Sequence, residues 1–190
     1  TLNNEKKHNN VEFKIFHNKK EISLFFNDMR NFGTLKFINS KDDLDKKLNE
    51  LGPDMFEKET TFEIFKKEVK AKGKWNITKV LMDQKIISGI GNYIKSESLY
   101  RSAISPYRDV NSISDEEFKT LFKEIKYVID QSYFHQGASV RDYTDIEDKK
   151  GDYHEYFLVY GKDKDSYGNL IKRFTSEDKR TTHWVPEIQK

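Results

Sequence analysis

The stretch that decides the fold runs from Leu81 to Glu97 and reads LMDQKIISGIGNYIKSE. Apolar residues at helical spacing precede and follow its centre, whereas Gly89 and Gly91 interrupt the helical pattern. Two glycines so close together permit a tight turn with exposed backbone amides. The sequence therefore predicts two helices joined by a glycine turn, with Asn92 at the start of the second helix.

The start of this second helix is a candidate anion site. Free amides and the positive end of the helix dipole attract phosphate, and Lys85 and Lys95 add positive charge on either side of the turn. The net charge of the chain is only +2, but Lys72 to Arg108 contains seven basic and two acidic residues. A local basic stripe of this kind favours phosphate binding. The alternative is an ordinary solvated helical surface.

Composition excludes several classes of protein. The 190 residues contain no cysteine, which rules out disulfides and thiolate metal sites. No stretch approaches the ~18 apolar residues of a membrane span, and the first residues show no signal-peptide pattern. Aromatic residues make up 14% of the chain, so a core is expected even though 35% of the residues are charged.

The N-terminal part predicts β-structure. Residues 11–27 alternate apolar and polar side chains around a polar turn at 17–20, which is typical of a hairpin. Residues 33–38 are expected to form a further strand. Because two strands need a sheet to rest on, the apolar face of the hairpin predicts partner strands. A short helix follows from Ser40 and ends at Gly52–Asp54.

The C-terminal two thirds predict helices and a final hairpin. Thr60, Asn76 and Ser114 are expected to cap successive helices. The last of these helices stops at Gly137 and is followed by a loop and a β-hairpin over 170–188. The predicted fold class is α+β. The expected units are β-strands (1–39), a linker (40–59), a helical domain (60–150) and a β-hairpin region (151–190).

The quoted stretch resembles the helix–two-turns–helix motif of the formamidopyrimidine-DNA glycosylase/endonuclease VIII family. The family pattern is Leu-(Met/Leu)-Asp-Gln-x3-(Ser/Ala/Val)-Gly-(Ile/Val)-Gly-Asn-x3-(Ala/Ser)-Glu, followed by Leu-x4-Ile-x-Pro. Leu99, Ile104 and Pro106 keep that last spacing. The resemblance implies that this motif contacts DNA phosphates next to a lesion. The residues expected to do so are Asn92, Lys85, Gly89 and Gly91.

Residues 28–33, Asp-Met-Arg-Asn-Phe-Gly, resemble the family's Asp-x-Arg-Arg-Phe-Gly loop. The resemblance implies that Phe32 fills the void left by an extruded base and that Arg30 reads the orphaned partner base. An aromatic ring can fill such a gap, and a guanidinium offers fixed donors to a base edge. Asn31 departs from the family's second Arg. The alternative is that Phe32 belongs to the core and Arg30 to a surface ion pair.

The C-terminal segment resembles the family's finger but lacks its zinc ligands. Zinc needs four N/S ligands, and the four matching positions are Tyr167, Leu170, Val185 and Ile188. We therefore predict a finger without metal or other cofactor, held by an apolar cluster, as in the family's zincless-finger members. Residues 179–184 resemble the turn whose Arg contacts phosphate, which gives that role to Arg180. The alternative is an exposed basic hairpin tip.

The resemblance implies a bifunctional DNA glycosylase and abasic-site lyase that excises oxidised bases and cleaves the strand by β- and δ-elimination. It implies double-stranded DNA with an oxidised base or abasic site as partner, a monomer, and no membrane. It also implies that residues 1–39 are the C-terminal strands of an N-terminal β-sandwich domain. The family's nucleophile is an N-terminal Pro followed by Glu, so catalytic residues are expected upstream of Thr1. Residues 137–143 resemble the segment leading to the loop over the extruded base. A composition rich in Lys, Asn and Ile resembles giant-virus members.

Two other interpretations stay open. The chain is either a non-catalytic DNA-binding protein derived from this family, or a helix-hairpin-helix-like nucleic-acid binder without lesion preference. The second does not account for Arg30, Phe32 and Arg180. A purely structural module is the remaining alternative.

Overall fold

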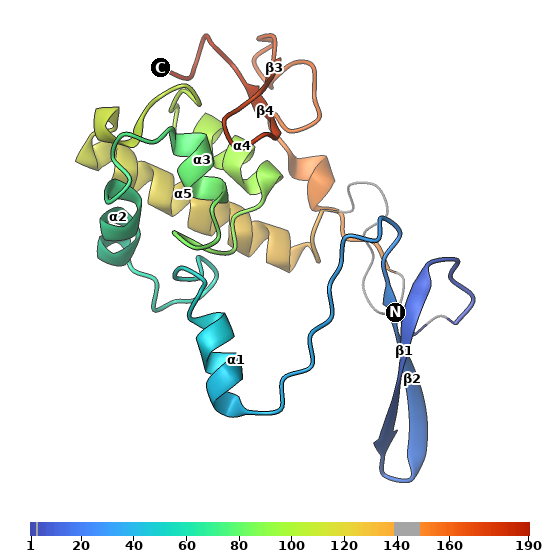
Figure 1. Cartoon of the computed structure of the whole chain (residues 1–190). Helices are drawn as coiled ribbons and strands as arrows, with labels where there is room; N and C mark the ends of the chain where they lie inside the picture. The colour runs from blue at the N-terminus through green and yellow to red at the C-terminus, as the bar shows by residue number, and fades with distance from the viewer. Residues whose placement is uncertain (3, 139–148) are drawn as a thin grey trace.

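The computed structural model describes residues 1–2, 4–138 and 149–190. The fold is α+β, as predicted (Figure 1). The elements are β1 (Asn9–His17), β2 (Lys20–Asn27), α1 (Lys41–Leu48), α2 (Phe62–Lys70), α3 (Ile77–Met82), α4 (Asn92–Arg101), a 3-10 turn (Val110–Ser112), α5 (Asp115–Phe134), a second 3-10 turn (Tyr153–Tyr156), β3 (Lys172–Thr175) and β4 (Thr181–Trp184). None of the helices in these ranges is both long and apolar enough to span a membrane.

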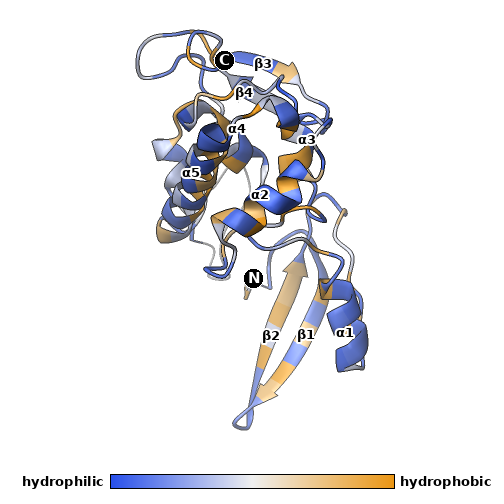
Figure 2. Ribbon diagram, turned by 90° about the vertical axis from the view of Figure 1, so that its left-hand side faces the viewer, coloured by the Kyte–Doolittle hydropathy of each residue, from blue (hydrophilic) through white to orange (hydrophobic). Residues whose placement is uncertain are grey.

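The N-terminal hairpin is confirmed, with β1 and β2 antiparallel and His17 opposite Lys20. Asn18 and Lys19 between them have φ of 49° and 63°, as a two-residue turn of this twist requires. The strand expected over 33–38 is wrong. Those residues do not form a strand, because no other segment among the described residues pairs with their backbone. The hairpin stands apart from the helices (Figure 1), and its apolar stripe is visible in Figure 2.

Helix α1 begins as predicted, since Ser40 accepts a hydrogen bond from the amide of Asp43. No residue of α1 is buried. The chain then reaches the helical part at Gly52, whose amide donates to the carbonyl of Gln84 at 2.8 Å. The hydroxyl of Ser88 donates back to the Gly52 carbonyl at 2.9 Å. The linker is thus fixed on the glycine turn between α3 and α4.

Helices α2 to α5 enclose the main apolar core. Asn76 caps α3, and Ser114 with Glu117 forms a capping box on α5, both as predicted. Helix α2 is capped by Thr61, not by Thr60. The Thr60 hydroxyl instead donates to the Asp54 carbonyl at 2.6 Å, which is why the expected cap was wrong by one residue.

The finger is a short hairpin of β3 and β4 on a small apolar core. That core is built by Tyr100, Val159, Ile171 and Val185, with Ile188 packed against it. The expected apolar replacement of a metal is therefore only half right. Tyr167 is 81% exposed and Leu170 is 62% exposed, so neither belongs to the cluster.

A buried carboxylate, Asp165, organises the first half of the finger instead. It accepts hydrogen bonds from the amide of Tyr167 at 3.0 Å, and from the amide and side chain of Asn169 at 2.8 and 2.9 Å. The hydroxyl of Tyr100 donates to the same carboxylate at 3.1 Å. Burial raises the pKa of Asp165, but these hydrogen bonds outweigh burial and hold the pKa below its ordinary value.

The buried side-chain amide of Gln189 supports the second half of the finger in the same way. Its side-chain oxygen accepts from the amide of Val185 at 2.7 Å, and its nitrogen donates to the carbonyl of Ile104 at 2.9 Å. Each half of the finger is therefore held by one hydrogen-bonding side chain.

Candidate nucleic-acid interface

The turn before α4 contains two glycines, Gly89 and Gly91, whose backbone conformations differ. Gly89 has φ +85°, in the left-handed region that favours glycine. The side chain of Gln84 holds this turn, because it accepts from the Gly89 amide at 3.1 Å and donates to the Ile90 carbonyl at 3.0 Å. Gly91 has no left-handed φ, and a Cβ built on it would meet no atom within 4 Å.

Gly91 is the N-cap of α4 and makes no side-chain capping hydrogen bond. The N-cap side chains of α1, α2, α3 and α5 all accept such a bond. The first-turn amides of a helix have no partner within the helix. Within the described part of the chain, the start of α4 thus keeps backbone donors for a ligand.

Asn92 joins this helix start to the finger. Its side-chain nitrogen donates to the carbonyl of Thr181 at 3.0 Å and contacts the hydroxyl of Tyr160 at 3.4 Å. Thr181 is the residue after Arg180, so the structure brings the turn that carries Arg180 to the side chain of Asn92. The side-chain donors of Asn92 are both engaged, which leaves its backbone amide as the group available to an anion.

Arg180 lies in the exposed turn between β3 and β4. Its amide contacts the Asp178 carboxylate at 3.3 Å, and Lys179 before it has φ 60°. Across the described ranges, no carboxylate pairs with the Arg180 guanidinium. The exposed side chain of Lys85 lies on the same glycine turn as Gly89.

The structure contradicts the interpretation of Lys95 as a surface charge. Lys95 was expected to add positive charge beside the turn, but its side chain is 0% exposed and its ammonium lies 2.5 Å from Asp178. A Lys at a helical position looks solvated in sequence, because the partner that buries it is far along the chain. Lys95 is therefore a buried, paired charge and not a surface charge.

Glu97 is a further residue that the sequence did not assign to a role. Its buried carboxylate accepts hydrogen bonds from the amides of Leu158 at 2.8 Å, Val159 at 2.9 Å and Tyr160 at 2.8 Å. Burial raises the pKa of Glu97, against the lowering effect of these three amides. Together with Asn92 and Lys95, Glu97 attaches the finger to α4.

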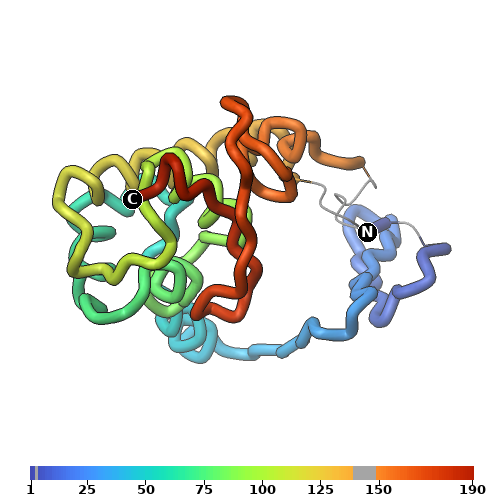
Figure 3. The backbone as a smooth tube through the Cα atoms, turned by 90° about the horizontal axis from the view of Figure 1, so that it is seen from above, coloured from blue at the N-terminus to red at the C-terminus, as the bar shows by residue number. Residues whose placement is uncertain are grey.

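Arg30 and Phe32 lie on a loop that follows β2. The Asp28 carboxylate accepts from the amides of Arg30 at 3.2 Å and Gly33 at 2.5 Å, which folds the loop. Phe32 is 82% exposed, and the Arg30 guanidinium carbon lies 6.0 Å from its ring centre. The alternative that Phe32 is a core residue is therefore wrong. The loop belongs to the hairpin that stands apart from α4 and the finger (Figure 3).

A concave surface of about 1110 Å³ opens beside the glycine turn. Aromatic side chains line much of it, namely Phe56, Tyr93, Tyr133 and Phe134, together with Gly89, Gln136 and Gly137. The Tyr93 hydroxyl is 2.7 Å from the Ser132 hydroxyl, so its ring is held in one orientation.

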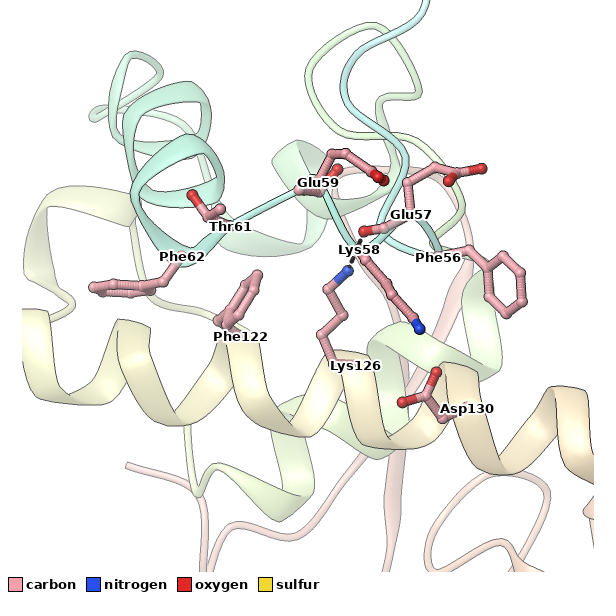
Figure 4. Close-up of a pocket in the computed structure, with 10 residues that line it drawn as sticks. Phe56, Glu57, Lys58, Glu59, Thr61, Phe62, Phe122, Lys126 and Asp130 are labelled. Carbon is pink, nitrogen blue, oxygen red and sulfur yellow. Dashed lines mark hydrogen bonds between the residues drawn. The ribbon is translucent and has the colours of Figure 1, made fainter.

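A second pocket, of about 690 Å³, lies between α2, α5 and the turn at 56–61 (Figure 4). Phe62 and Phe122 form its apolar wall, and Lys126 donates to the Glu57 carbonyl at 2.6 Å. None of the residues predicted to bind DNA lines this pocket.

The described residues contain no group of three or more His, Cys, Asp or Glu side chains that would hold a metal ion. Most of the segment 137–143, expected to lead to a loop over an extruded base, lies outside the described residues.

Two family models match the chain. One, described as the formamidopyrimidine-DNA glycosylase H2TH domain, covers residues 51–144. The other, described as the C-terminal domain of formamidopyrimidine-DNA glycosylase, covers residues 144–190.

Curated relatives agree with these models. A formamidopyrimidine-DNA glycosylase of Carboxydothermus hydrogenoformans is 36% identical over 90% of this chain and 62% of the relative. A protein of the same name from Prochlorococcus marinus is 36% identical over 95% of this chain and 62% of the relative. The chain thus spans about three fifths of the length of these relatives.

Solved structures of the same kind share the fold. The MutM (Fpg) protein of Thermus thermophilus has a TM-score of 0.79 at 26% identity, over 88% of this chain and 65% of that chain. The Fpg of Lactococcus lactis in complex with DNA containing an abasic site has a TM-score of 0.79 at 26% identity, over 90% and 63% of the two chains.

Proposed function

The chain belongs to the formamidopyrimidine-DNA glycosylase family, and from this premise we propose that it is the damaged-DNA-binding part of a base-excision-repair enzyme. The whole enzyme is a DNA glycosylase and abasic-site lyase that removes oxidised bases and cleaves the strand. The partner is double-stranded DNA with an oxidised base or an abasic site, bound by a monomer.

The observation that carries this proposal is the contact between Asn92 and Thr181. It holds the β3–β4 turn that carries Arg180 against the start of α4, whose first amides have no partner within the helix. Backbone amides at a helix start bind phosphate oxygens, and a guanidinium binds phosphate through two parallel hydrogen bonds. Two such groups on contacting elements suit two phosphates of one DNA strand, with Lys85 adding positive charge.

The concave surface beside Gly89 is the place for the extruded nucleotide. An enzyme that acts on a base takes it out of the stack and holds it between aromatic or apolar side chains. Tyr93 and Phe134 supply such a lining, next to the residues proposed to hold the backbone. Phe32 is proposed to fill the void in the duplex, and Arg30 to contact the orphaned base.

Binding to two duplexes tests the proposal, one intact and one with a stable abasic-site analogue. Arg180→Ala is expected to weaken binding to both duplexes roughly tenfold and to reduce the slope of log affinity against log salt by about 1. Lys179→Ala is the matched control, because it removes one positive charge from the same turn. An equal effect of both variants would mean that only general charge matters.

Phe32→Ala is expected to reduce the preference for the abasic duplex while binding to intact DNA persists. Equal affinity of the unaltered protein for both duplexes would favour a binder without lesion preference. Borohydride trapping on abasic DNA separates enzyme from derived non-catalytic protein. No covalent adduct with the full-length gene product would end the enzyme proposal.

A further inference from the structure

A buried ion pair joins α4 to the tip of the finger. The ammonium of Lys95 lies 2.5 Å from the Asp178 carboxylate, and the two side chains are 0% and 4% exposed. Burial lowers the pKa of Lys95, against the opposing effect of Asp178. Charged side chains are almost never so buried unless paired, because removing them from water is costly. Such pairs contribute little net stability, and their best-attested use is to select one arrangement of the chain.

Asp178 is also the centre of the turn that carries Arg180. Its carboxylate contacts the amide of Arg180 at 3.3 Å and accepts a short hydrogen bond from the hydroxyl of Ser176. The Ser176 hydroxyl lies 3.1 Å from the carbonyl of Arg180 and 3.5 Å from the Lys95 ammonium. The backbone on both sides of Arg180 is therefore fixed by groups that Lys95 contacts.

Lys95 is itself fixed relative to the proposed phosphate site. It stands three residues after Asn92, on the same helix, and its amide donates to the carbonyl of Gly91 at 2.9 Å. Any displacement of the β3–β4 turn relative to the start of α4 would break the contact with Asp178. The contact is charged and buried, and a low local dielectric strengthens the attraction between groups that stay close.

We propose that the Lys95–Asp178 ion pair positions the guanidinium of Arg180 relative to the start of α4, so that Lys95 controls DNA binding without touching DNA. This inference rests on the proposed function, since it assumes that Arg180 binds DNA. Lys95 is a positioning residue, and its effect must therefore pass through Arg180.

A double-mutant cycle on the abasic duplex tests this dependence. Lys95→Met removes the charge and keeps most of the side-chain volume. It is expected to weaken binding roughly tenfold in the unaltered background and less than about twofold in Arg180→Ala. An equal loss in both backgrounds would overturn the proposal, as would unchanged binding by folded Lys95→Met.

Asp178→Asn is the second variant, in case Lys95→Met does not fold. It keeps an oxygen that accepts from the Arg180 amide but removes the charge that Lys95 needs. The same dependence on Arg180 is expected. Joining the two changes removes both charges, and this double variant should recover part of the lost affinity because neither charge is left buried alone.

Val69→Ala is the control for a general loss of stability. Val69 is fully buried in α2, which lies away from the finger (Figure 1), and its truncation leaves a cavity in the main core. Folded Val69→Ala should bind DNA as the unaltered protein does. If Arg180→Ala alone leaves DNA binding unchanged, the proposed function fails. If Arg180→Ala weakens binding and Lys95→Met does not, only the positioning role fails.

Discussion

The side chain of Asn92 donates a hydrogen bond to the carbonyl of Thr181 at 3.0 Å, across 89 positions of sequence. This contact holds the turn of Arg180 against the start of α4. It also gives Asn92 a role in the free protein, since its side chain holds the finger while its backbone amide lies at the helix start. The two proposed phosphate-binding groups therefore depend on each other.

Asn92→Ala is expected to weaken binding to any duplex roughly tenfold, because it removes one of the contacts that hold the Arg180 turn on α4. Tyr160→Phe is the matched control, since it removes only the longer 3.4 Å contact of the same Asn92 nitrogen. That variant should bind DNA nearly as the unaltered protein does. Fluorescence anisotropy at several salt concentrations measures both. A Tyr160→Phe loss as large as that of Asn92→Ala would argue against the Thr181 contact as the cause.

The two glycines of the turn provide a second pair of variants. Gly89→Ala is expected to destabilise the fold by about 1–2 kcal/mol, because Gly89 has φ +85°. Gly91→Ala should cost only roughly 0.5 kcal/mol at the N-cap, since its Cβ would lie in open space. A phosphate bound at the α4 start would occupy that space, so Gly91→Ala should weaken DNA binding roughly tenfold.

Urea unfolding and DNA binding on the same samples separate the two effects. The expected pattern is a stability loss for Gly89→Ala and a binding loss without comparable destabilisation for Gly91→Ala. Normal DNA affinity of Gly91→Ala would remove the α4 amides from the proposed interface.

Local signals in the sequence predicted much of this structure correctly. Ser40, Asn76 and Ser114 act as helix caps because their short polar side chains accept hydrogen bonds within three residues, and such contacts depend only on neighbours in the chain. The turn at Asn18 was also predictable, because a turn depends on residues that are neighbours in the chain. The strand expected over 33–38 failed because a strand exists only with a pairing partner, which alternation alone does not supply.

For the candidate site, the sequence predicted several residues but not the contacts between them. The family's motifs named Asn92, Gly91 and Arg180. The contact of Asn92 with Thr181, the residue after Arg180, could not be predicted from either motif alone. Lys95 was interpreted as surface charge because its buried partner, Asp178, lies 83 positions away. Spacing also placed the finger's supports at Tyr167 and Leu170, which are exposed, whereas Asp165 supports that half through hydrogen bonds.

Asp165→Asn tests that support. The change replaces one accepting oxygen by a donor, which then faces donors such as the Tyr100 hydroxyl or the Asn169 side chain. Loss of about two hydrogen bonds predicts a destabilisation of about 2 kcal/mol. Asp163→Asn is the matched control, because Asp163 makes an exposed ion pair with Arg173 and should cost less than about 1 kcal/mol.

Thermal unfolding of both variants, with and without a strong chelator, gives the measurement. The chelator should leave the unfolding temperature of the unaltered protein unchanged, since hydrogen bonds, and not a metal ion, are expected to stabilise this finger. A chelator-induced drop in the midpoint would contradict that view, as would equal midpoints for Asp165→Asn and Asp163→Asn.

Acid should weaken the fold through Glu117. Hydrogen bonds from Arg108 lower the pKa of Glu117 from 4.5 to about 2, and its capping contacts with Ser114 act in the same direction. A carboxyl with a lowered folded pKa stabilises the protein above its unfolded pKa, and this contribution is lost as pH falls towards the folded value. Because Glu117 is 36% exposed, solvent screening limits the contribution to about 1 kcal/mol.

Glu117→Gln should therefore lower the free energy of unfolding at neutral pH and reduce its fall between about pH 5 and pH 2. Part of that fall should persist, because Lys66 and Lys70 also lower the pKa of Asp115 to about 2. Urea midpoints at a series of pH values measure the difference between the two proteins. Parallel pH curves for Glu117→Gln and the unaltered protein would mean that the Arg108 contact leaves the titration of Glu117 unchanged.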